Sequence, residues 1–436
     1  MYNMKLIVSL ILCVLAGTQA REGFGPGDQD WGYVTVREGA HMFWWLFFTT
    51  ADVAHYTEKP LIVWLQGGPG ASSTGYGNFA ELGPLDLNLE PREHTWVKDA
   101  NVIFVDNPVG TGFSYVESPT QLTTTNKEIA DDFVELLRGF YEKYPEFKTV
   151  PFYIVSESYG GKMTIEIASV LDTAIKGGSI ESNFIGVGLG DSWLEPVTIV
   201  QQWAPYLWSV GAVDQRGRDN VQAAADLTKE LFEQGRYVQS TNQWGTTEYV
   251  IWDEAANIDF YNILTPIRAR GKSYRPLAKP EGATRDEEDE ILERIMAQVR
   301  ESLGLEAQWG VQSNAVFSTL SEDFMKPVTQ VTEYVLDNTD VKVAVFNGQL
   351  DLIVCTPGIV LWLDSLQWSK TSEWLSAPRP PFAVNGYYEG FEKHAGNLAM
   401  YWVNRAGHMV PSDNPAAMDY ILRKLTNDYD GNVKRA

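Results

Sequence analysis

The hydrophobic pattern in the first half of the chain predicts strands that alternate with helices. Short, continuous apolar runs are typical of strands buried on both faces, and they occur at 61–65, 102–105, 151–155 and 185–189. Residues 128–141 instead have apolar positions at helical spacing. This alternation predicts a mainly parallel sheet covered by helices, in which ligands bind at the carboxyl ends of the strands.

Four further segments extend the predicted sheet. Residues 31–36 and 41–49 favour an antiparallel hairpin around the turn at Glu38 and Gly39. Apolar runs return late in the chain, at 341–346 and 398–403, and each of them ends at polar residues. We therefore expect one sheet built from both ends of the chain.

The alternation stops between residues 193 and 324, where helical patterns replace it. Within this insertion one apolar stripe runs along an otherwise charged helix, through Ile291, Ile295, Val299 and Leu303. We expect the insertion to form a helical cap over the sheet. The predicted domains are a first core segment at 21–192, the cap at 193–324 and a second core segment at 325–436.

A strongly charged stretch lies between the helices of the predicted cap. The basic residues Arg268, Arg270, Lys272 and Arg275 precede the acidic run 286–290. We expect a solvated loop here. Proteolytic nicking of this loop is the alternative, because exposed, polar loop tips are the preferred sites of cleavage.

The first twenty residues have the layout of a secretory signal peptide. Lys5 precedes an apolar run at 6–15, and small residues follow up to Ala20. The apolar run is too short to span a bilayer. We expect cleavage after Ala20, and a mature protein in the secretory or lysosomal lumen or outside the cell.

Charge and cysteine content narrow the possible partners and crosslinks. The formal net charge of −23 argues against nucleic acid or an anionic membrane as a partner. Of the two cysteines, Cys13 lies in the predicted signal peptide, which leaves Cys355. We therefore expect no intramolecular disulfide, and the 436 residues, 44% of them hydrophobic, are sufficient to bury a large core without one.

Residues 150–167 predict a strand, a tight turn and a helix, with Ser158 at the apex of the turn. A serine in this position has a free hydroxyl, and the backbone N–H of Tyr159 points to where a substrate oxyanion forms. The stretch departs from the G-x-S-x-G pattern because Ser156 replaces the first glycine. Taken alone, it is explained equally well by an ordinary strand-to-helix turn capped by a serine.

Two further polar residues follow predicted strands and support a catalytic role for Ser158. Asp351 follows the strand at 341–346, and His408 follows the strand at 398–403. The order Ser158, Asp351, His408 is that of an α/β-hydrolase catalytic triad. Asp191 also ends a strand and is the rival of Asp351. The five histidines lack paired ligand spacing and no cysteine pair exists, so we expect no metal site.

Together these motifs resemble the serine carboxypeptidases, and within that family they are most similar to the retinoid-inducible branch. The resemblance spans nearly the whole mature chain. It rests on Gln66-Gly67-Gly68-Pro69-Gly70 with Ser72-Ser73, on Gly190-Asp191-Ser192-Trp193, on Glu157-Ser158-Tyr159-Gly160, on Asp351, and on Gly407-His408-Met409-Val410-Pro411.

The resemblance implies an α/β-hydrolase fold and an enzyme that removes single residues from peptides with a free C-terminus, without a cofactor. It assigns the two oxyanion donors to the N–H groups of Gly68 and Tyr159, and it places Met409 in the pocket for the leaving residue. It assigns binding of the substrate carboxylate to Gln66, Gly67, Glu81 and Glu157.

Carboxylic acids that hold a carboxylate imply activity at acidic pH. Two close carboxylates raise each other's pKa, and a protonated one donates a hydrogen bond to the substrate anion. Two alternative functions remain open at this stage. One is an acyltransferase of the same fold, and the other is a catalytically weak, carboxypeptidase-like binding protein, which the departures at Gln66 and Ser156 suggest.

Overall fold

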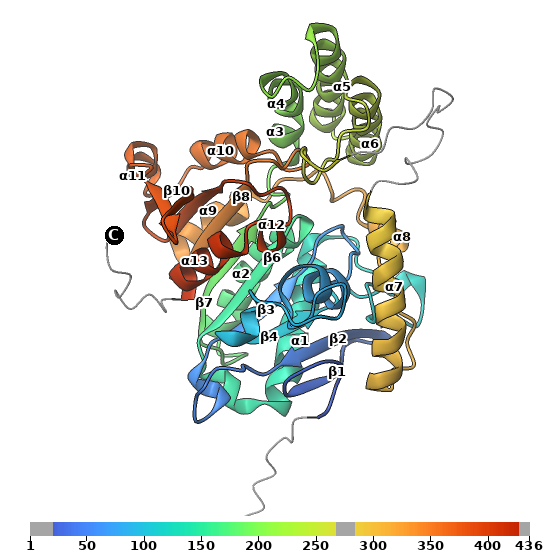
Figure 1. Ribbon diagram of the computed structural model, residues 1–436, viewed down its shortest axis with the longest axis vertical. Helices are drawn as coiled ribbons and strands as arrows, with labels where there is room; N and C mark the ends of the chain where they lie inside the picture. The colour runs from blue at the N-terminus through green and yellow to red at the C-terminus, as the bar shows by residue number, and fades with distance from the viewer. Residues whose placement is uncertain (1–20, 267–283, 427–436) are drawn as a thin grey trace, which may run out of the picture.

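The computed structural model describes residues 21–266 and 284–426, and an 11-stranded sheet runs through them (Figure 1). The strands are β1 (Gln29–Arg37), β2 (Ala40–Phe47), β3 (Leu61–Leu65), β4 (Asn101–Val105), β5 (Tyr115–Val116), β6 (Phe152–Glu157), β7 (Phe184–Gly190), β8 (Lys342–Gly348), β9 (Pro381–Val384), β10 (Tyr387–Ala395) and β11 (Leu398–Val403). The predicted signal peptide at 1–20 and the basic residues at 268–275 lie outside the described residues.

The sheet has a parallel centre and antiparallel edges. Its strand order is β1-β2-β4-β3-β6-β7-β8-β11-β10-β9, and β5 pairs with β2 beside this path. The neighbours from β4 to β11 pair in parallel, whereas the pairs at both edges are antiparallel. This confirms the predicted mainly parallel sheet and the hairpin of β1 and β2.

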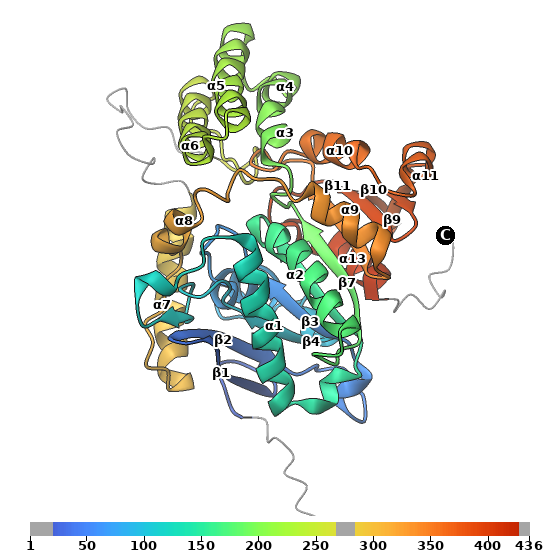
Figure 2. The ribbon, with the colours of Figure 1, turned by 180° about the vertical axis from the view of Figure 1, so that it is seen from behind.

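Helices cover both faces of the sheet (Figures 1 and 2). Apolar side chains of α1, α2, α9 and α10 belong to the core on one face, and those of η2, α7 and α13 belong to the core on the other. These helices are α1 (Asn126–Lys143), α2 (Tyr159–Lys176), the π-helix η2 (Ser73–Leu82), α7 (Thr284–Leu303), α9 (Thr329–Asn338), α10 (Thr356–Ser365) and α13 (Pro415–Thr426). Strands buried on both sides explain the continuous apolar runs in the sequence.

The insertion between β7 and β8 divides into two parts. The helices α3 (Pro196–Gln201), α4 (Trp203–Ser209), α5 (Gln215–Glu233) and α6 (Tyr237–Glu254) follow the carboxyl end of β7 and project from the body of the molecule (Figure 1). In contrast, α7 lies apart from α5 and α6 in both views. The domain boundaries at 193 and 324 remain our proposal.

Helix α7 packs against the sheet and explains the apolar stripe that the sequence contains. Leu292, Ile295 and Val299 are buried in the same core as η2. At its end, the indole Nε1 of Trp31 in β1 donates a 3.1 Å hydrogen bond to the carbonyl oxygen of Leu303. The stripe therefore extends one face of the core near β1 rather than joining the projecting helices. Among the described residues, no helix is both long and apolar enough to cross a membrane.

Candidate active site

Ser158 lies at a sharp turn between β6 and α2. Its φ of 61° is in the left-handed region, which is strained for a residue with a side chain. The turn is held because Ser158 N–H donates to the carbonyl oxygen of Gly190 at 3.0 Å, and Trp193 N–H donates to the carbonyl oxygen of Ser158 at 2.9 Å. A side chain at Gly160 would come within 2.5 Å of the carbonyl oxygen of Leu65, so the first turn of α2 requires glycine there.

Ser156, the departure from the G-x-S-x-G pattern, fits the turn without distortion of the sheet. It is fully buried in β6, and its hydroxyl donates a 3.2 Å hydrogen bond to the carbonyl oxygen of Gly188 in β7. A buried hydroxyl with a partner costs little, which explains why a serine is accepted here.

Asp351 is the partner of His408. Its Oδ2 lies 2.8 Å from Nδ1 of the imidazole, and its Oδ1 accepts a 3.0 Å hydrogen bond from Val354 N–H. Both side chains are buried. The rival residue, Asp191, instead accepts a 2.7 Å hydrogen bond from Gly348 N–H. Of the two rival carboxylates, Asp351 is therefore the one that the structure places in hydrogen-bond contact with the imidazole.

The imidazole faces the turn that carries Ser158. His408 Nε2 lies 3.9 Å from Oε1 of Glu157, the residue that precedes Ser158. The described residues include no hydrogen bond between Ser158 Oγ and the imidazole. Such contacts are often long in a free enzyme and shorten when substrate binds.

Tyr261 supports His408 and was not predicted from the sequence. Its carbonyl oxygen accepts a 2.6 Å hydrogen bond from His408 N–H, and its ring packs edge-on against the imidazole at 5.1 Å. A side chain at Gly407 would come within 2.1 Å of the same carbonyl oxygen. Tyr261 belongs to the insertion, far from His408 in sequence, so no local pattern could indicate the contact.

The glycine-rich loop after β3 lies directly against Ser158. A side chain at Gly67 would approach Cβ of Ser158 to 2.5 Å. Gly68 is exposed and has a φ of 106°, a conformation that favours glycine. Tyr159 is the first residue of α2, where a backbone N–H has no acceptor within its own helix. The loop that carries Gly68 therefore contacts Ser158, and the other predicted oxyanion donor, the Tyr159 N–H, directly follows Ser158 in the chain.

The side chain of Tyr159 is held in place by buried contacts. Its hydroxyl donates a 3.3 Å hydrogen bond to Asp323, and its ring stacks on Phe324 with a centroid distance of 5.9 Å. Lys162 forms an ion pair with the same Asp323 at 3.2 Å. Burial lowers the pKa of Lys162 to about 8. This buried network fixes the start of α2 and therefore the direction of the Tyr159 N–H.

Glu81, Glu157 and Gln66 meet in one buried cluster next to the serine. The Gln66 amide Nε2 donates to Oε1 of Glu81 at 3.1 Å and to Oε1 of Glu157 at 3.0 Å. Trp64 Nε1 donates a 2.7 Å hydrogen bond to Gln66 Oε1. All of these side chains are at most 3% exposed. Both donors of Gln66 are therefore engaged by the glutamates, which differs from the direct contact with the substrate carboxylate that we expected.

The pKa of Glu81 is raised above its usual range. Burial is the main cause, whereas the hydrogen bonds from Glu157 and Gln66 and the nearby His408 act in the opposite direction. The expected direction of the shift is therefore present, but desolvation rather than repulsion between the two carboxylates is its origin. A neutral Glu81 has a hydrogen that it can donate to an anion.

Residues 309–313, which we call the strap, tie the insertion to the glycine-rich loop. Ala71 and Gln312 form an antiparallel bridge, and Gln312 Nε2 donates a 2.7 Å hydrogen bond to the carbonyl oxygen of Pro69. Trp309 Nε1 donates a 2.9 Å hydrogen bond to Ser72 Oγ. The strap holds the loop that carries Gly68 and was not predicted from the sequence.

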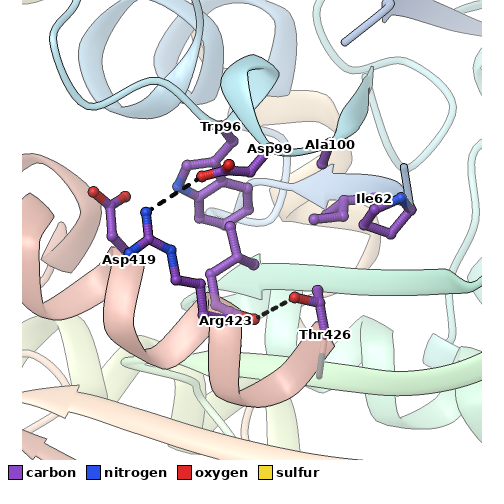
Figure 3. A pocket seen from close by; sticks show the side chains of 9 residues that line it. Ile62, Trp96, Asp99, Ala100, Asp419, Arg423 and Thr426 are labelled. Carbon is purple, nitrogen blue, oxygen red and sulfur yellow. Dashed lines mark hydrogen bonds and ion pairs between the residues drawn. The ribbon is translucent and has the colours of Figure 1, made fainter. Parts of the chain in front are cut away.

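The remaining predicted residue, Met409, directly follows His408 and is partly exposed. A separate pocket lies at the amino ends of β3 and β4 (Figure 3). It is lined by Pro60 and Ala100, which precede β3 and β4, and by Arg423, which forms an ion pair with Asp99 at 3.6 Å. Ser158 follows β6, which is parallel to β3. This pocket is therefore remote from the serine.

Comparison with known sequences places the chain among carboxypeptidases. A family model described as serine carboxypeptidase matches residues 21–428. The chain is 42% identical to the retinoid-inducible serine carboxypeptidase of Rattus norvegicus, over 97% of this chain and 96% of that protein. It is 33% identical to the serine carboxypeptidase-like 51 protein of Arabidopsis thaliana, over 97% of this chain and 98% of that protein. The resemblance that the motifs predicted is confirmed.

Comparison with solved structures supports the fold. The prohormone-processing carboxypeptidase Kex1Δp of Saccharomyces cerevisiae has a TM-score of 0.78 and 21% identity, with 92% of each chain covered. At this identity the likeness concerns the fold alone. The predicted α/β-hydrolase architecture is confirmed.

Proposed function

The chain belongs to the serine carboxypeptidase family, and from this premise we propose that it releases single C-terminal residues from peptides through an acyl-enzyme, preferentially at acidic pH. The observation that carries the proposal is the arrangement of one partly exposed serine, Ser158, beside two polar groups. One is the Asp351 and His408 pair at 2.8 Å, and the other is the buried cluster of Glu81 and Glu157.

Ser158 is the proposed nucleophile. Its Oγ attacks the carbonyl carbon of the last peptide bond while His408 Nε2 takes the hydroxyl proton, and Asp351 stabilises the resulting imidazolium. The oxyanion accepts hydrogen bonds from the N–H groups of Gly68 and Tyr159. His408 then gives its proton to the departing amine, and water hydrolyses the remaining ester.

The acidic cluster selects substrates with a free C-terminus. Gln66 occupies one oxygen of each glutamate, and a protonated Glu81 is a donor for the terminal carboxylate of the peptide. Because burial raises the pKa of Glu81, this donor is retained under mildly acidic conditions and is lost as the pH rises. Activity at acidic pH follows from that loss, and a kcat/KM that rises from pH 5 to pH 8 would contradict it.

The site of action is a separate proposal. The layout of residues 1–20 supports entry into the secretory pathway and a mature enzyme in the lysosomal lumen or outside the cell. An acidic compartment is compatible with the proposed role of Glu81. N-terminal sequencing of the protein secreted by, or retained in, expressing cells tests this directly, since a mature chain that still contains Lys5 would refute it.

Hydrolysis of N-blocked dipeptides at pH 5 tests the proposed function. We expect wild type to release the C-terminal residue, and Ser158→Ala to lose about 10³-fold or more in kcat. Ser156→Ala is the matched control, because Ser156 is two residues away and buried against Gly188. The same dipeptide with an amidated C-terminus is expected to be a poor substrate.

Three outcomes decide between this function and its alternatives. Equal cleavage by Ser158→Ala would reject the proposed nucleophile. Transfer of the acyl group to an added alcohol or amine, in preference to water, would indicate an acyltransferase. Binding of the peptide without turnover by the wild-type protein would indicate a binding protein.

A further inference from the structure

Asp191 is a buried carboxylic acid beside the catalytic residues that the mechanism above does not use. One oxygen of Asp191, one oxygen of Asp351 and one ring nitrogen of His408 all lie within 4.8 Å of one another. All three side chains are at most 1% exposed. Asp191 is therefore in a position to act on the residue that orients the imidazole.

The two oxygens of Asp191 have different environments. Oδ1 accepts the 2.7 Å hydrogen bond from Gly348 N–H. Oδ2 is fully buried and accepts no hydrogen bond among the described residues. A buried oxygen without a donor is costly for a carboxylate, but a protonated oxygen can itself donate to a neighbouring anion.

The backbone holds Asp191 firmly in this place. Its φ is 41°, an uncommon value for a residue other than glycine, and its N–H donates a 2.8 Å hydrogen bond to the carbonyl oxygen of Phe346. This hydrogen bond links the end of β7 to β8, the strand that leads to Asp351. The side chain is thereby positioned by two adjacent strands.

We propose that Asp191 is a positioning residue, which carries a proton in the working enzyme and donates it in a hydrogen bond to the carboxylate of Asp351. This inference rests on the proposed function, because it concerns the same catalytic site. It gives Asp351 a third donor, in addition to the imidazole and Val354 N–H.

The distribution of neighbouring charges favours the proton on Asp191 rather than on Asp351. Asp351 already accepts two hydrogen bonds, from His408 and from Val354, whereas Asp191 accepts one. The titratable groups that face Asp191 are Asp351, His408 and Asp413, and in the described part of the chain no lysine or arginine forms an ion pair with it. Burial, followed by the charge of Asp351, raises the pKa of Asp191 well above its usual range.

The consequence is an alkaline limit on kcat. When Asp191 loses its proton, two buried negative charges repel each other beside the imidazole, and Asp351 is displaced from His408. This limit differs from that of Glu81, because Glu81 is a proposed ligand of the substrate carboxylate, whereas Asp191 is proposed to act on Asp351. Loss of the Glu81 proton raises KM, whereas loss of the Asp191 proton lowers kcat.

The pH dependence of kcat for Asp191→Ala and Asp191→Asn tests the proposal. Asp191→Ala removes the donor, and we expect kcat at pH 5 to fall about tenfold with little change in KM. Asp191→Asn keeps a neutral donor of the same shape, so it is expected to recover most of that loss. Because an amide does not ionise, its kcat should also persist to a higher pH than that of wild type.

Asp132→Asn is the matched control. Asp132 is equally buried, at 1% exposure, but it pairs with Arg37 far from the site, so the pH profile of kcat should not change. Thermal unfolding of each variant shows whether it is folded. If Asp191→Ala does not fold, the pH profile of kcat for Asp191→Asn, compared with that of wild type, still tests the proposal.

Several results would overturn the proposal. A kcat of Asp191→Asn as low as that of Asp191→Ala would show that the charge of Asp191 is required, not its proton. If the pH profile of kcat is unchanged in both variants, Asp191 has only a structural role. Loss of wild-type activity in EDTA, restored by a divalent cation, would make the cluster a metal site. If the wild-type protein shows no hydrolysis that depends on Ser158, the proposed function itself is refuted.

Discussion

The indole of Trp64 fixes the orientation of the Gln66 amide through a hydrogen bond of 2.7 Å from Nε1 to Oε1. An amide whose oxygen is held by a donor must present its NH₂ group in the other direction, here to Glu81 and Glu157. Trp64 contacts Gln66 and thereby sets how the Gln66 amide faces Glu81 and Glu157 in the buried cluster.

Removing the indole donor is expected to weaken substrate binding. In Trp64→Phe the Gln66 amide is free to rotate, and its oxygen can then face the glutamates. We expect KM for an N-blocked dipeptide to rise about three- to tenfold, with kcat within about twofold of wild type. Trp96→Phe is the control, since Trp96 packs edge-on against Trp64 at 5.5 Å and donates nothing to Gln66. Equal KM values in wild type and Trp64→Phe would contradict the role of the indole.

Glu81 is expected to set the pH dependence of KM. Its pKa is raised by burial, so the protonated form that binds the substrate carboxylate is lost as the pH increases. In wild type we expect KM to rise about tenfold or more between pH 5 and pH 8. Glu81→Gln carries a permanent NH₂ donor, and its KM should vary little over this range. Steady-state kinetics at each pH measures both, and a Glu81→Gln variant with the slope of wild type would reject Glu81 as the titrating group.

The strap is expected to support the oxyanion loop. Gln312→Ala removes the hydrogen bond to the carbonyl oxygen of Pro69, next to Gly68. We expect kcat to fall about three- to tenfold, while KM changes little, because the loop then holds the Gly68 donor less firmly. Gln298→Ala serves as the control, since Gln298 is exposed on α7. A higher KM with an unchanged kcat would instead indicate that the strap supports substrate binding.

Buried acids are expected to make the protein less stable at neutral pH than at acidic pH. Burial raises the pKa values of Glu81, Asp106 and Asp191, so the native state binds more protons than the unfolded chain above about pH 4. Their contribution to stability is lost as the pH rises toward the raised values. We expect Tm to fall by several degrees between pH 5 and pH 7.

Lys162 does not contribute to this change in stability between pH 5 and pH 7. Its lowered pKa of about 8 leaves the amine charged in both the native and the unfolded state below that value. Differential scanning calorimetry of wild type and of Glu81→Gln measures the effect. The variant should show a smaller fall in Tm, and a Tm that increases from pH 5 to pH 7 in wild type would contradict the linkage.

The parallel centre of the sheet was predictable because each of its strands is buried on both faces. Residues 61–65 were predicted with the bounds that β3 has, and 398–403 with those of β11. Strand β10 was missed, since it lies next to the edge strand β9 and mixes exposed and buried residues without a continuous apolar run. The helix η2 was missed because Gly75 and Gly77 disfavour helix, and burial of nearly all its residues compensates.

Only those residues of the site that belong to local sequence motifs could be predicted. Strand periodicity places Trp64 and Gln66 on the same side of the chain, so their contact could have been found from spacing. The contact of Tyr261 with His408 and that of the strap with the glycine-rich loop join segments far apart in sequence, and no local pattern encodes them. The choice between Asp191 and Asp351 required the 2.8 Å distance to the imidazole.

The insertion is attached to the glycine-rich loop by backbone pairing and side-chain hydrogen bonds, and the cysteine that the structure describes, Cys355, is a free thiol at 0% exposure. The architecture of residues 21–266 and 284–426 therefore does not depend on the redox potential of its surroundings. Dithiothreitol should leave its unfolding temperature unchanged, and we expect residues 21–436 to fold in the reducing cytoplasm of a bacterial host without oxidative refolding.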